Sequence, residues 1–243
     1  MTRDGRPSPK ESLIIALDFP ELGPARELAR ALAGEVGMLK VGLELFNAEG
    51  PRAIRELREL GASVFYDAKL CDIPNTVAGA AAAAGRLGVG MLNVHAFGGK
   101  AMMAAAKEAA AQGAQQAGFP APLVIGVTVL TSLGDREVEE EIGLRDSAGE
   151  AALRLAALAK EAGLEGVVCS VHEVSEVKRA CGKDFIAVTP GIRPVGAGRG
   201  DQRRVATPAE AWAQGADYLV IGRPVTRAGD PRQAVAEILA EMG

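Results

Sequence analysis

The chain alternates short apolar runs with longer segments in which apolar and polar residues recur at helical spacing. Two of the runs, 13–17 and 218–221, are hydrophobic at every position, which is typical of parallel strands covered by helices. The runs predict eight strands, at 12–18, 37–42, 63–68, 91–96, 122–130, 166–171, 185–189 and 218–222. The segments between them predict helices at 24–33, 51–60, 75–87, 99–112, 147–162, 173–181, 207–215 and 231–242, with a further short helix at 135–146.

Eight strand–helix units in one chain predict a single α/β domain with a (β/α)8 TIM barrel, which typically takes about 250 residues. An open, doubly wound sheet is the alternative fold. Glycines stand where several helices should end, at positions 61, 113, 163 and 182. No linker interrupts the pattern, so we expect a flexible N-terminal tail over 1–11 and one barrel domain over 12–243.

Composition narrows the class of protein. The net charge is −4 with both signs interspersed and aromatic residues are 4%, which argues against nucleic-acid binding. No apolar run approaches the roughly 18 residues of a membrane span, and the polar N-terminus does not have the pattern of a signal peptide. The three cysteines form no CxxC pair and only two histidines are present. We therefore expect reduced thiols, a cytoplasmic location and no metal site.

An unusual group of charges follows the third apolar run. Asp67, Lys69 and Asp72 form a D-x-K-x-x-D pattern where a strand gives way to a loop. Asp67 and Lys69 are two residues apart, so they share one face of a strand. Because unpaired buried charge is costly, such a group indicates a site. Lys40 adds a fourth charge, and an alternating Lys–Asp–Lys–Asp array would suit a charged transition state.

Other polar residues fall at the ends of predicted strands. In a (β/α)8 barrel the active site lies at the C-terminal ends of the strands, and we expect these side chains to gather there. The candidates are Asp18, Lys40, Asp67, Lys69, Thr131, Ser132, Pro190, Gly191, Arg193, Gly222 and Arg223.

Several motifs carry a family resemblance. They are Leu17-Asp18-Phe19, Lys40-Val41-Gly42, Asp67-Ala68-Lys69, Asp72-Ile73-Pro74-Asn75-Thr76, Val129-Leu130-Thr131-Ser132, Thr189-Pro190-Gly191-Ile192-Arg193-Pro194, Asp201-Gln202 and Ile221-Gly222-Arg223-Pro224. In this order and at these spacings the chain resembles the orotidine 5′-monophosphate (OMP) decarboxylase family over nearly its whole length. It departs from the common family pattern at Ala68 and at Leu70-Cys71, none of which is a charged position.

The resemblance implies a reaction and a set of roles. The family converts OMP to UMP and CO2, in de novo pyrimidine biosynthesis, with no metal or organic cofactor. Lys69 would protonate the C6 carbanion beside Asp67, and Lys40 and Asp72 would complete the catalytic group. The resemblance also implies a homodimer, in which Asp72 and Thr76 reach the neighbouring subunit's site.

Substrate contacts follow from the same resemblance. The phosphate would be bound by Arg193, Gln202, Gly222 and Arg223, of which the first two lie in a glycine-rich segment, 193–204, expected to be a mobile lid. Asp18 and Lys40 would bind the ribose hydroxyls, and Thr131 and Ser132 the base. Ile73, Thr76 and Pro190 complete the expected substrate-binding residues.

Other interpretations remain open for single residues and for the whole chain. Asp67 and Lys69 could form an ordinary buried ion pair, His95 is expected to be a hydrogen-bonded core residue, and Arg203 and Arg204 are interpreted as solvated loop charges. A magnesium-dependent sugar-phosphate decarboxylase or aldolase of the same superfamily shares the D-x-K-x-x-D pattern. It would need an acidic ligand near the second strand, where this chain has Lys40. A non-catalytic nucleotide binder is a third possibility.

Overall fold

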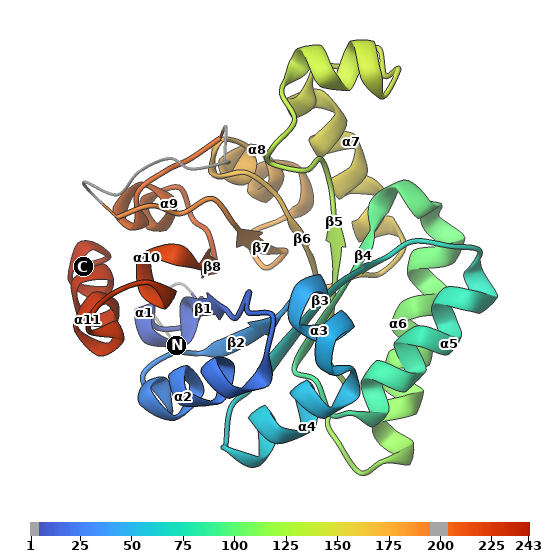
Figure 1. The fold of residues 1–243 in the computed structure, drawn as a ribbon. Helices are drawn as coiled ribbons and strands as arrows, with labels where there is room; N and C mark the ends of the chain where they lie inside the picture. Colours follow the sequence, from blue (N-terminus) through green and yellow to red (C-terminus); the bar gives the residue numbers. More distant parts are fainter. Residues whose placement is uncertain (1–4, 195–203) are drawn as a thin grey trace.

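The computed structural model of the protein describes residues 5–194 and 204–243. Eight parallel strands close into a barrel in sequence order, and helices surround them (Figure 1). The (β/α)8 barrel predicted from the sequence is therefore confirmed, and the open sheet is not. The strands are β1(Leu13–Ala16), β2(Met38–Val41), β3(Val64–Leu70), β4(Met91–His95), β5(Leu123–Val127), β6(Gly166–Val168), β7(Ile186–Thr189) and β8(Tyr218–Ile221).

The predicted helices are all present, with boundaries that shift by a few residues. Three short helices were not predicted, because segments of four to seven residues show too little periodicity: α1(Pro9–Ser12), α3(Leu43–Glu49) and α10(Arg223–Thr226). The predicted helices are α2(Leu22–Leu32), α4(Pro51–Glu59), α5(Pro74–Arg86), α6(Gly99–Gln116), α7(Ala148–Glu161), α8(Val171–Cys181), α9(Pro208–Ala213) and α11(Pro231–Glu241). Single turns η1(Ala96–Gly98) and η2(Glu137–Glu141) lie after β4 and β5.

Alternate strand residues point into the barrel. Ile14 and Ile15 are both fully buried although they face opposite sides of β1, because the barrel interior covers one face and the helices cover the other. This explains the unbroken apolar runs in the sequence. The interior group consists of Ile14, Ala16, Phe65, Met91, Ile125, Val188 and Val220.

Glycine allows α5 and α6 to pack closely. A Cβ atom at Gly85 would lie 2.2 Å from the carbonyl oxygen of Ala110, and one at Gly113 would lie 2.1 Å from that of Ala82. No side chain fits in that space. Gly113 was expected to end its helix, and this prediction is wrong, because α6 continues to Gln116 and uses the glycine as a packing position.

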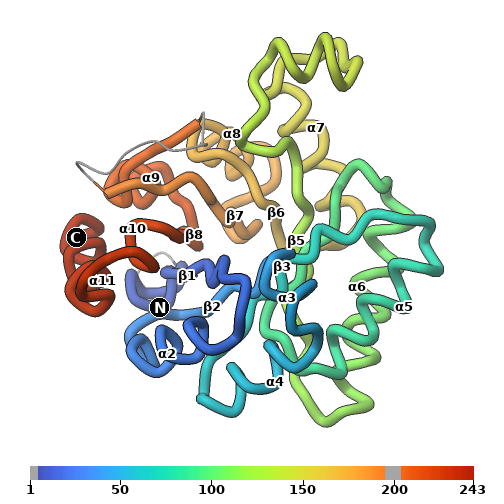
Figure 2. Tube along the Cα trace, viewed as in Figure 1, coloured from blue at the N-terminus to red at the C-terminus, as the bar shows by residue number. Residues whose placement is uncertain are grey.

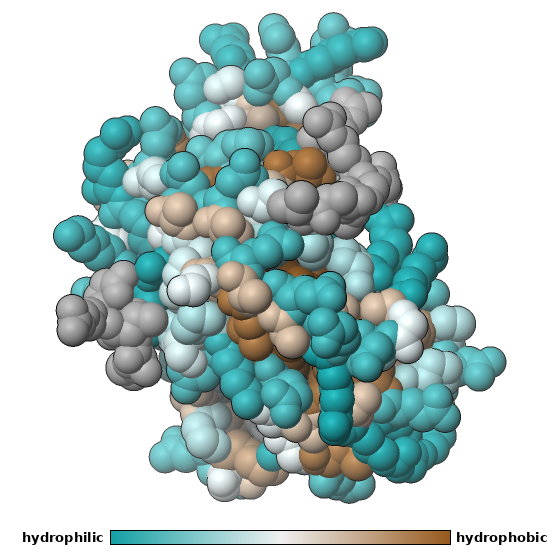
Figure 3. Space-filling view, turned by 90° about the vertical axis from the view of Figure 1, so that its left-hand side faces the viewer, coloured by the Kyte–Doolittle hydropathy of each residue, from teal (hydrophilic) through white to brown (hydrophobic). Residues whose placement is uncertain are grey.

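The chain winds once around the barrel, so α11 returns to contact α2 (Figure 2). On the face shown in Figure 3, hydrophilic side chains predominate and the apolar ones form small patches. Within the described part of the chain, no helix is long and apolar enough to cross a membrane.

The segment expected to be a tail is described from Gly5 onward. Its last three residues lie in α1, whose N-terminus is capped by Ser8. Arg6 stacks over the ring of Trp212 at 4.2 Å and donates a hydrogen bond to the carbonyl of that residue at 3.0 Å. The flexibility of the segment stays a prediction.

Candidate active site

A cavity of about 700 Å³ lies at the C-terminal ends of the strands. Most of the candidate residues line it, as the position of active sites in this fold predicts. The candidates in its wall are Asp18, Lys40, Asp67, Lys69, Thr131, Ser132, Pro190, Gly191, Arg193, Gly222 and Arg223. The rest of the wall is largely apolar and includes Val127, Val129, Leu130, Val168, Val188 and Val220.

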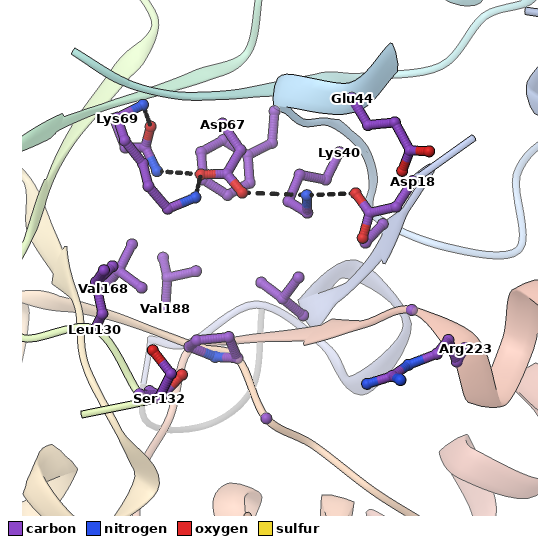
Figure 4. Close-up of a pocket in the computed structure, with 18 of the residues that line it drawn as sticks. Asp18, Lys40, Glu44, Asp67, Lys69, Leu130, Ser132, Val168, Val188 and Arg223 are labelled. Carbon is purple, nitrogen blue, oxygen red and sulfur yellow. Dashed lines mark hydrogen bonds and ion pairs between the residues drawn. The ribbon is translucent and has the colours of Figure 1, made fainter. Parts of the chain in front are cut away.

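Four charged side chains form a continuous row along one wall (Figure 4). Lys40 Nζ lies 3.1 Å from Asp18 Oδ1 and 3.1 Å from Asp67 Oδ2. Lys69 Nζ lies 2.6 Å from Asp67 Oδ1. The alternating array expected from the sequence is therefore present. Lys40 lies on β2, Asp67 and Lys69 lie on the neighbouring strand β3, and Asp18 follows the end of β1.

Burial and charge act against each other within this row. Burial alone would raise the pKa of Asp67, but the nearby Lys40 and Lys69 outweigh it and hold the pKa at about 2. Burial would likewise lower the pKa of Lys40, yet Asp67 and Asp18 raise it above its ordinary value. Both groups are therefore charged at neutral pH.

Lys69 is held in an unusual backbone conformation. Its φ is +49°, and among the residues that the structure describes it is the only one other than glycine with a positive φ. The register between β3 and β4 shifts between Tyr66 and Leu70, which marks an irregularity in the strand at this point. Such a conformation costs about 1–3 kcal/mol and persists only where neighbouring contacts impose it.

Asn93 supplies two of those contacts from β4. Its side-chain oxygen accepts a hydrogen bond from the Lys69 backbone N–H at 2.7 Å, and its Nδ2 donates to Asp67 Oδ1 at 2.7 Å. Sequence reasoning missed this residue. The available signal was a polar residue inside an apolar run, at the inward-facing position between Met91 and His95.

Gly42 leaves the space that the Lys40 side chain occupies. A Cβ atom there would lie 2.8 Å from Lys40 Nζ and 3.2 Å from Asp18 Oδ1. Any larger residue would push on the ion pair between them. Gly222 differs, because a Cβ atom there would make only ordinary contact with Ala16 at 3.6 Å. Its missing side chain leaves space in the cavity itself.

The remaining wall carries Thr131, Ser132, Arg193 and Arg223. Thr131 is buried, whereas Ser132 is exposed. Arg223 begins α10 directly after β8 and lies across the cavity from Lys69 (Figure 4). Glu44 and Arg227 also line the cavity and were not expected from the sequence.

Three candidates lie outside this cavity wall. Asp72, Ile73 and Thr76 stand at the start of α5 and are exposed, with Ile73 at 67%. The Asp72 carboxylate accepts a hydrogen bond from the backbone N–H of Ile73 at 2.6 Å. Gln202 and most of the predicted lid lie outside the described residues.

The other titratable groups near the site are not built into the row. His95 ends β4 and is half-buried, and burial followed by the charge of Lys69 lowers its pKa. Its Nδ1 is buried without a hydrogen-bond partner among the described residues, so the expected hydrogen bond of His95 is not seen at this atom.

Across residues 5–194 and 204–243, no three His, Cys, Asp or Glu side chains cluster as metal ligands.

Comparison with known proteins places the chain among relatives of similar length. The model of the Orotidine 5′-phosphate decarboxylase / HUMPS family matches residues 11–238. A protein named orotidine 5′-phosphate decarboxylase from Moorella thermoacetica is 54% identical over 96% of this chain and 92% of its own. A protein of the same name from Alkalilimnicola ehrlichii is 53% identical over 95% of each chain.

Solved structures share the same fold. The crystal structure of orotidine 5′-phosphate decarboxylase from Lactobacillus acidophilus matches with a TM-score of 0.82 and 37% identity, over 98% of this chain and 99% of the other. An uncharacterized conserved protein from Geobacillus kaustophilus matches with a TM-score of 0.82 and 42% identity, over 95% of this chain and all of the other.

Proposed function

The chain belongs to the Orotidine 5′-phosphate decarboxylase / HUMPS family, and on that premise we propose how its cavity converts OMP to UMP and CO2. The observation that carries the mechanism is the pairing of Lys69 with Asp67 at 2.6 Å in the cavity wall. The pair is backed by Lys40 at 3.1 Å and by Asn93 at 2.7 Å.

The chemical difficulty lies at C6 of the pyrimidine ring. The bond from C6 to the carboxylate breaks, CO2 leaves, and the electron pair stays on a carbon that the ring delocalises poorly. The Lys69 ammonium lies beside this carbon, stabilises the developing negative charge and then transfers a proton to C6, which completes UMP. Lys69 recovers its proton from solvent when the product leaves.

Asp67 acts on both the Lys69 ammonium and the substrate carboxylate. Its carboxylate holds the Lys69 ammonium in place, and its pKa of about 2 keeps it negatively charged at neutral pH. That fixed charge lies beside the substrate carboxylate, and the repulsion between the two is relieved as CO2 departs. The Lys40 ammonium forms an ion pair with the second carboxylate oxygen of Asp67. Together with Asp18, Lys40 also binds the ribose hydroxyls.

Lys69 cannot supply the whole acceleration. An ammonium about 4 Å from a developing charge contributes roughly 4 kcal/mol at an effective dielectric of 20, whereas enzymes lower barriers by about 8–23 kcal/mol. The remainder must come from preorganisation and from binding energy at parts of the substrate that do not react. Arg223 and Arg193, with Gln202, bind the phosphate, and Gly222 and Pro190 shape the space around it. Thr131 and Ser132 contact the base.

A homodimer completes the proposal. Asp72 and Thr76 lie outside the wall of their own subunit's cavity, on an exposed surface that includes Ile73. In a dimer this surface reaches the neighbouring site, where Asp72 joins the catalytic group and Ile73 and Thr76 contact the substrate.

The free thiols of Cys71, Cys169 and Cys181 support a cytoplasmic location.

The magnesium-dependent sugar-phosphate activity is not favoured. The relatives that are 53–54% identical are named orotidine 5′-phosphate decarboxylase, and Lys40 occupies the region of β2 where that chemistry needs an acidic ligand. Incubation of the purified protein with OMP and EDTA tests the choice: UMP should form. Activity on a sugar phosphate only after addition of magnesium would contradict the proposal, and binding of UMP without turnover of OMP would indicate a nucleotide binder.

A further inference from the structure

Arg204 is the first described residue after the segment 195–203, and its side chain is largely buried. Only 15% of it is exposed, and it forms an ion pair through Nη1 with Oε1 of Glu173, whose side chain is 5% exposed. The interpretation of Arg204 as a solvated loop charge is therefore wrong, while Arg203 lies outside the described residues.

The same guanidinium contacts the wall of the cavity. Its Nη2 donates to the carbonyl oxygens of Val129 at 3.4 Å and of Leu130 at 3.3 Å. These two residues line the cavity and directly precede Thr131 and Ser132, which line it too. One side chain therefore links α8, where Glu173 lies, to the segment that follows β5.

Glu173 is fixed independently of Arg204. Its second oxygen accepts a hydrogen bond from the backbone N–H of Ser170 at 2.8 Å, as part of the capping box that begins α8. Burial raises the pKa of Glu173 and Arg204 opposes that shift. Removal of the arginine would leave a buried carboxylate without its counter-ion, which is strongly unfavourable.

The segment after β5 needs such support because it has left the sheet. Its backbone hydrogen bonds include Thr128 N–H to the Val168 carbonyl at 3.2 Å, at its start, and Leu133 N–H to the Leu130 carbonyl at 3.0 Å, within its own turn. Arg204 adds bonds to the stretch between these two, where Leu130 is 39% exposed.

We propose that Arg204 is a positioning residue that holds the wall segment Val129–Ser132 against α8. It thereby fixes the position of Thr131 and Ser132 relative to the pyrimidine base of the substrate. This inference rests on the proposed function, since it assumes that Thr131 and Ser132 face the pyrimidine. Arg204 touches no reacting atom. Its effect passes through the two carbonyl groups.

Two ligands separate the base side of the cavity from the phosphate side. UMP carries the base, whereas ribose 5-phosphate keeps the sugar and phosphate without it. With Arg204→Ala, the dissociation constant of UMP and the kcat/KM for OMP should each worsen by about tenfold to a hundredfold, the size of effect that misplaced groups produce. The dissociation constant of ribose 5-phosphate should not change.

Three further variants serve as references. Arg204→Lys keeps a charge near Glu173, but one ammonium cannot span the carboxylate and both carbonyls, so its loss should be intermediate. Glu173→Gln keeps an acceptor for the cap and should act in the same direction, less strongly. Lys178→Ala breaks a buried pair with Asp217 (2.5 Å) elsewhere on α8. It should lower thermal stability without changing kcat/KM.

Three results would overturn the inference. Unchanged kcat/KM in Arg204→Ala, or loss of stability alone as in Lys178→Ala, would make the pair purely structural. An equal loss for ribose 5-phosphate would place the effect on the phosphate side. If Arg204→Ala does not fold, an unchanged UMP affinity in both Glu173→Gln and Arg204→Lys would count against the inference. A wild-type protein that binds UMP but does not convert OMP would instead contradict the proposed function.

Discussion

The side-chain oxygen of Asn93 accepts a hydrogen bond at 2.7 Å from the backbone N–H of Lys69 and so holds Lys69 at a positive φ. Without this bond the backbone of Lys69 would be free to return to a less strained conformation. The geometry of the proposed proton donor therefore depends on a residue of the neighbouring strand.

Asn93→Ala tests this dependence. The change leaves the Lys69 N–H without its acceptor and removes one of the two hydrogen bonds that Asp67 Oδ1 accepts, while the bond from Lys69 Nζ remains. It should lower the free energy of unfolding by about 1–3 kcal/mol. It should also reduce kcat for OMP while the affinity for UMP changes little, because the lost contacts orient a catalytic group. Steady-state kinetics, UMP titration and chemical denaturation measure the three quantities. Asn47→Ala removes an exposed side-chain bond on α3 and should affect none of them. Equal kcat in Asn93→Ala and wild type would contradict the role of Asn93.

Asp67 makes a pH-dependent contribution to stability. Its folded pKa is about 2, below the ordinary 3.8, so the stabilisation is fully present above pH 4 and is lost as the pH falls from about 4 towards 2. Asp67→Asn abolishes the ionisation, removes the carboxylate paired with Lys69 and leaves Lys40 with Asp18 as its remaining counter-ion. Urea unfolding of both proteins across this range should show a more stable wild type near neutral pH and a difference that shrinks on acidification. A difference that stays constant from pH 6 to pH 2 would mean that Asp67 is not held ionised by the two lysines.

Arg223 should matter only for phosphorylated ligands. Arg223→Ala should weaken UMP binding by roughly tenfold to a hundredfold, as expected for the loss of charge-assisted hydrogen bonds, and should leave uridine binding unchanged. Calorimetric titration of both ligands measures the two effects. Arg136→Ala removes an exposed arginine paired with Glu140 and provides the control. Equal weakening of UMP and uridine would remove Arg223 from the phosphate site.

Mixed subunits test whether Asp72 acts across a dimer interface. Lys69→Ala and Asp72→Ala proteins should each be nearly inactive. In a hybrid dimer one site would combine an intact Lys69 with an intact Asp72 from the neighbour. After unfolding and refolding of an equal mixture, about a quarter of the wild-type activity should return, given random pairing in a two-fold dimer. No gain over the separate proteins would show that Asp72 does not act on the neighbouring site.

The sequence was informative where a residue's chemistry disagreed with its surroundings. The apolar runs located all eight strands, because residues such as Ile14 and Ile15 are covered on both sides of the sheet. Asp67 and Lys69 were recognised since charges at the end of an apolar run are rarely tolerated without a purpose. Their gathering with Lys40 and Asp18 followed from the common edge of a parallel barrel.

The sequence was less informative about partners chosen by tertiary structure. Asn93 looks like one polar residue in a strand, and its role emerges only when β3 and β4 pair in their shifted register. Arg204 looked like part of a solvated basic pair, since nothing local indicates a carboxylate from α8. Gly113 was interpreted as a helix end, because the neighbouring helix that requires its missing side chain is distant in the sequence.

Protonation of C6 by Lys69 is the central step of the proposed mechanism. Single-turnover formation of UMP from OMP should be compared in wild type, Lys69→Ala and Lys69→Arg, with UMP affinity and circular dichroism as measures of an intact site. Lys69→Ala should lose at least about 10³-fold in rate, because roughly 4 kcal/mol is removed. Lys69→Arg should stay nearly as slow, because a guanidinium keeps its proton. Substantial turnover in either variant would contradict the assignment of Lys69 as the proton donor.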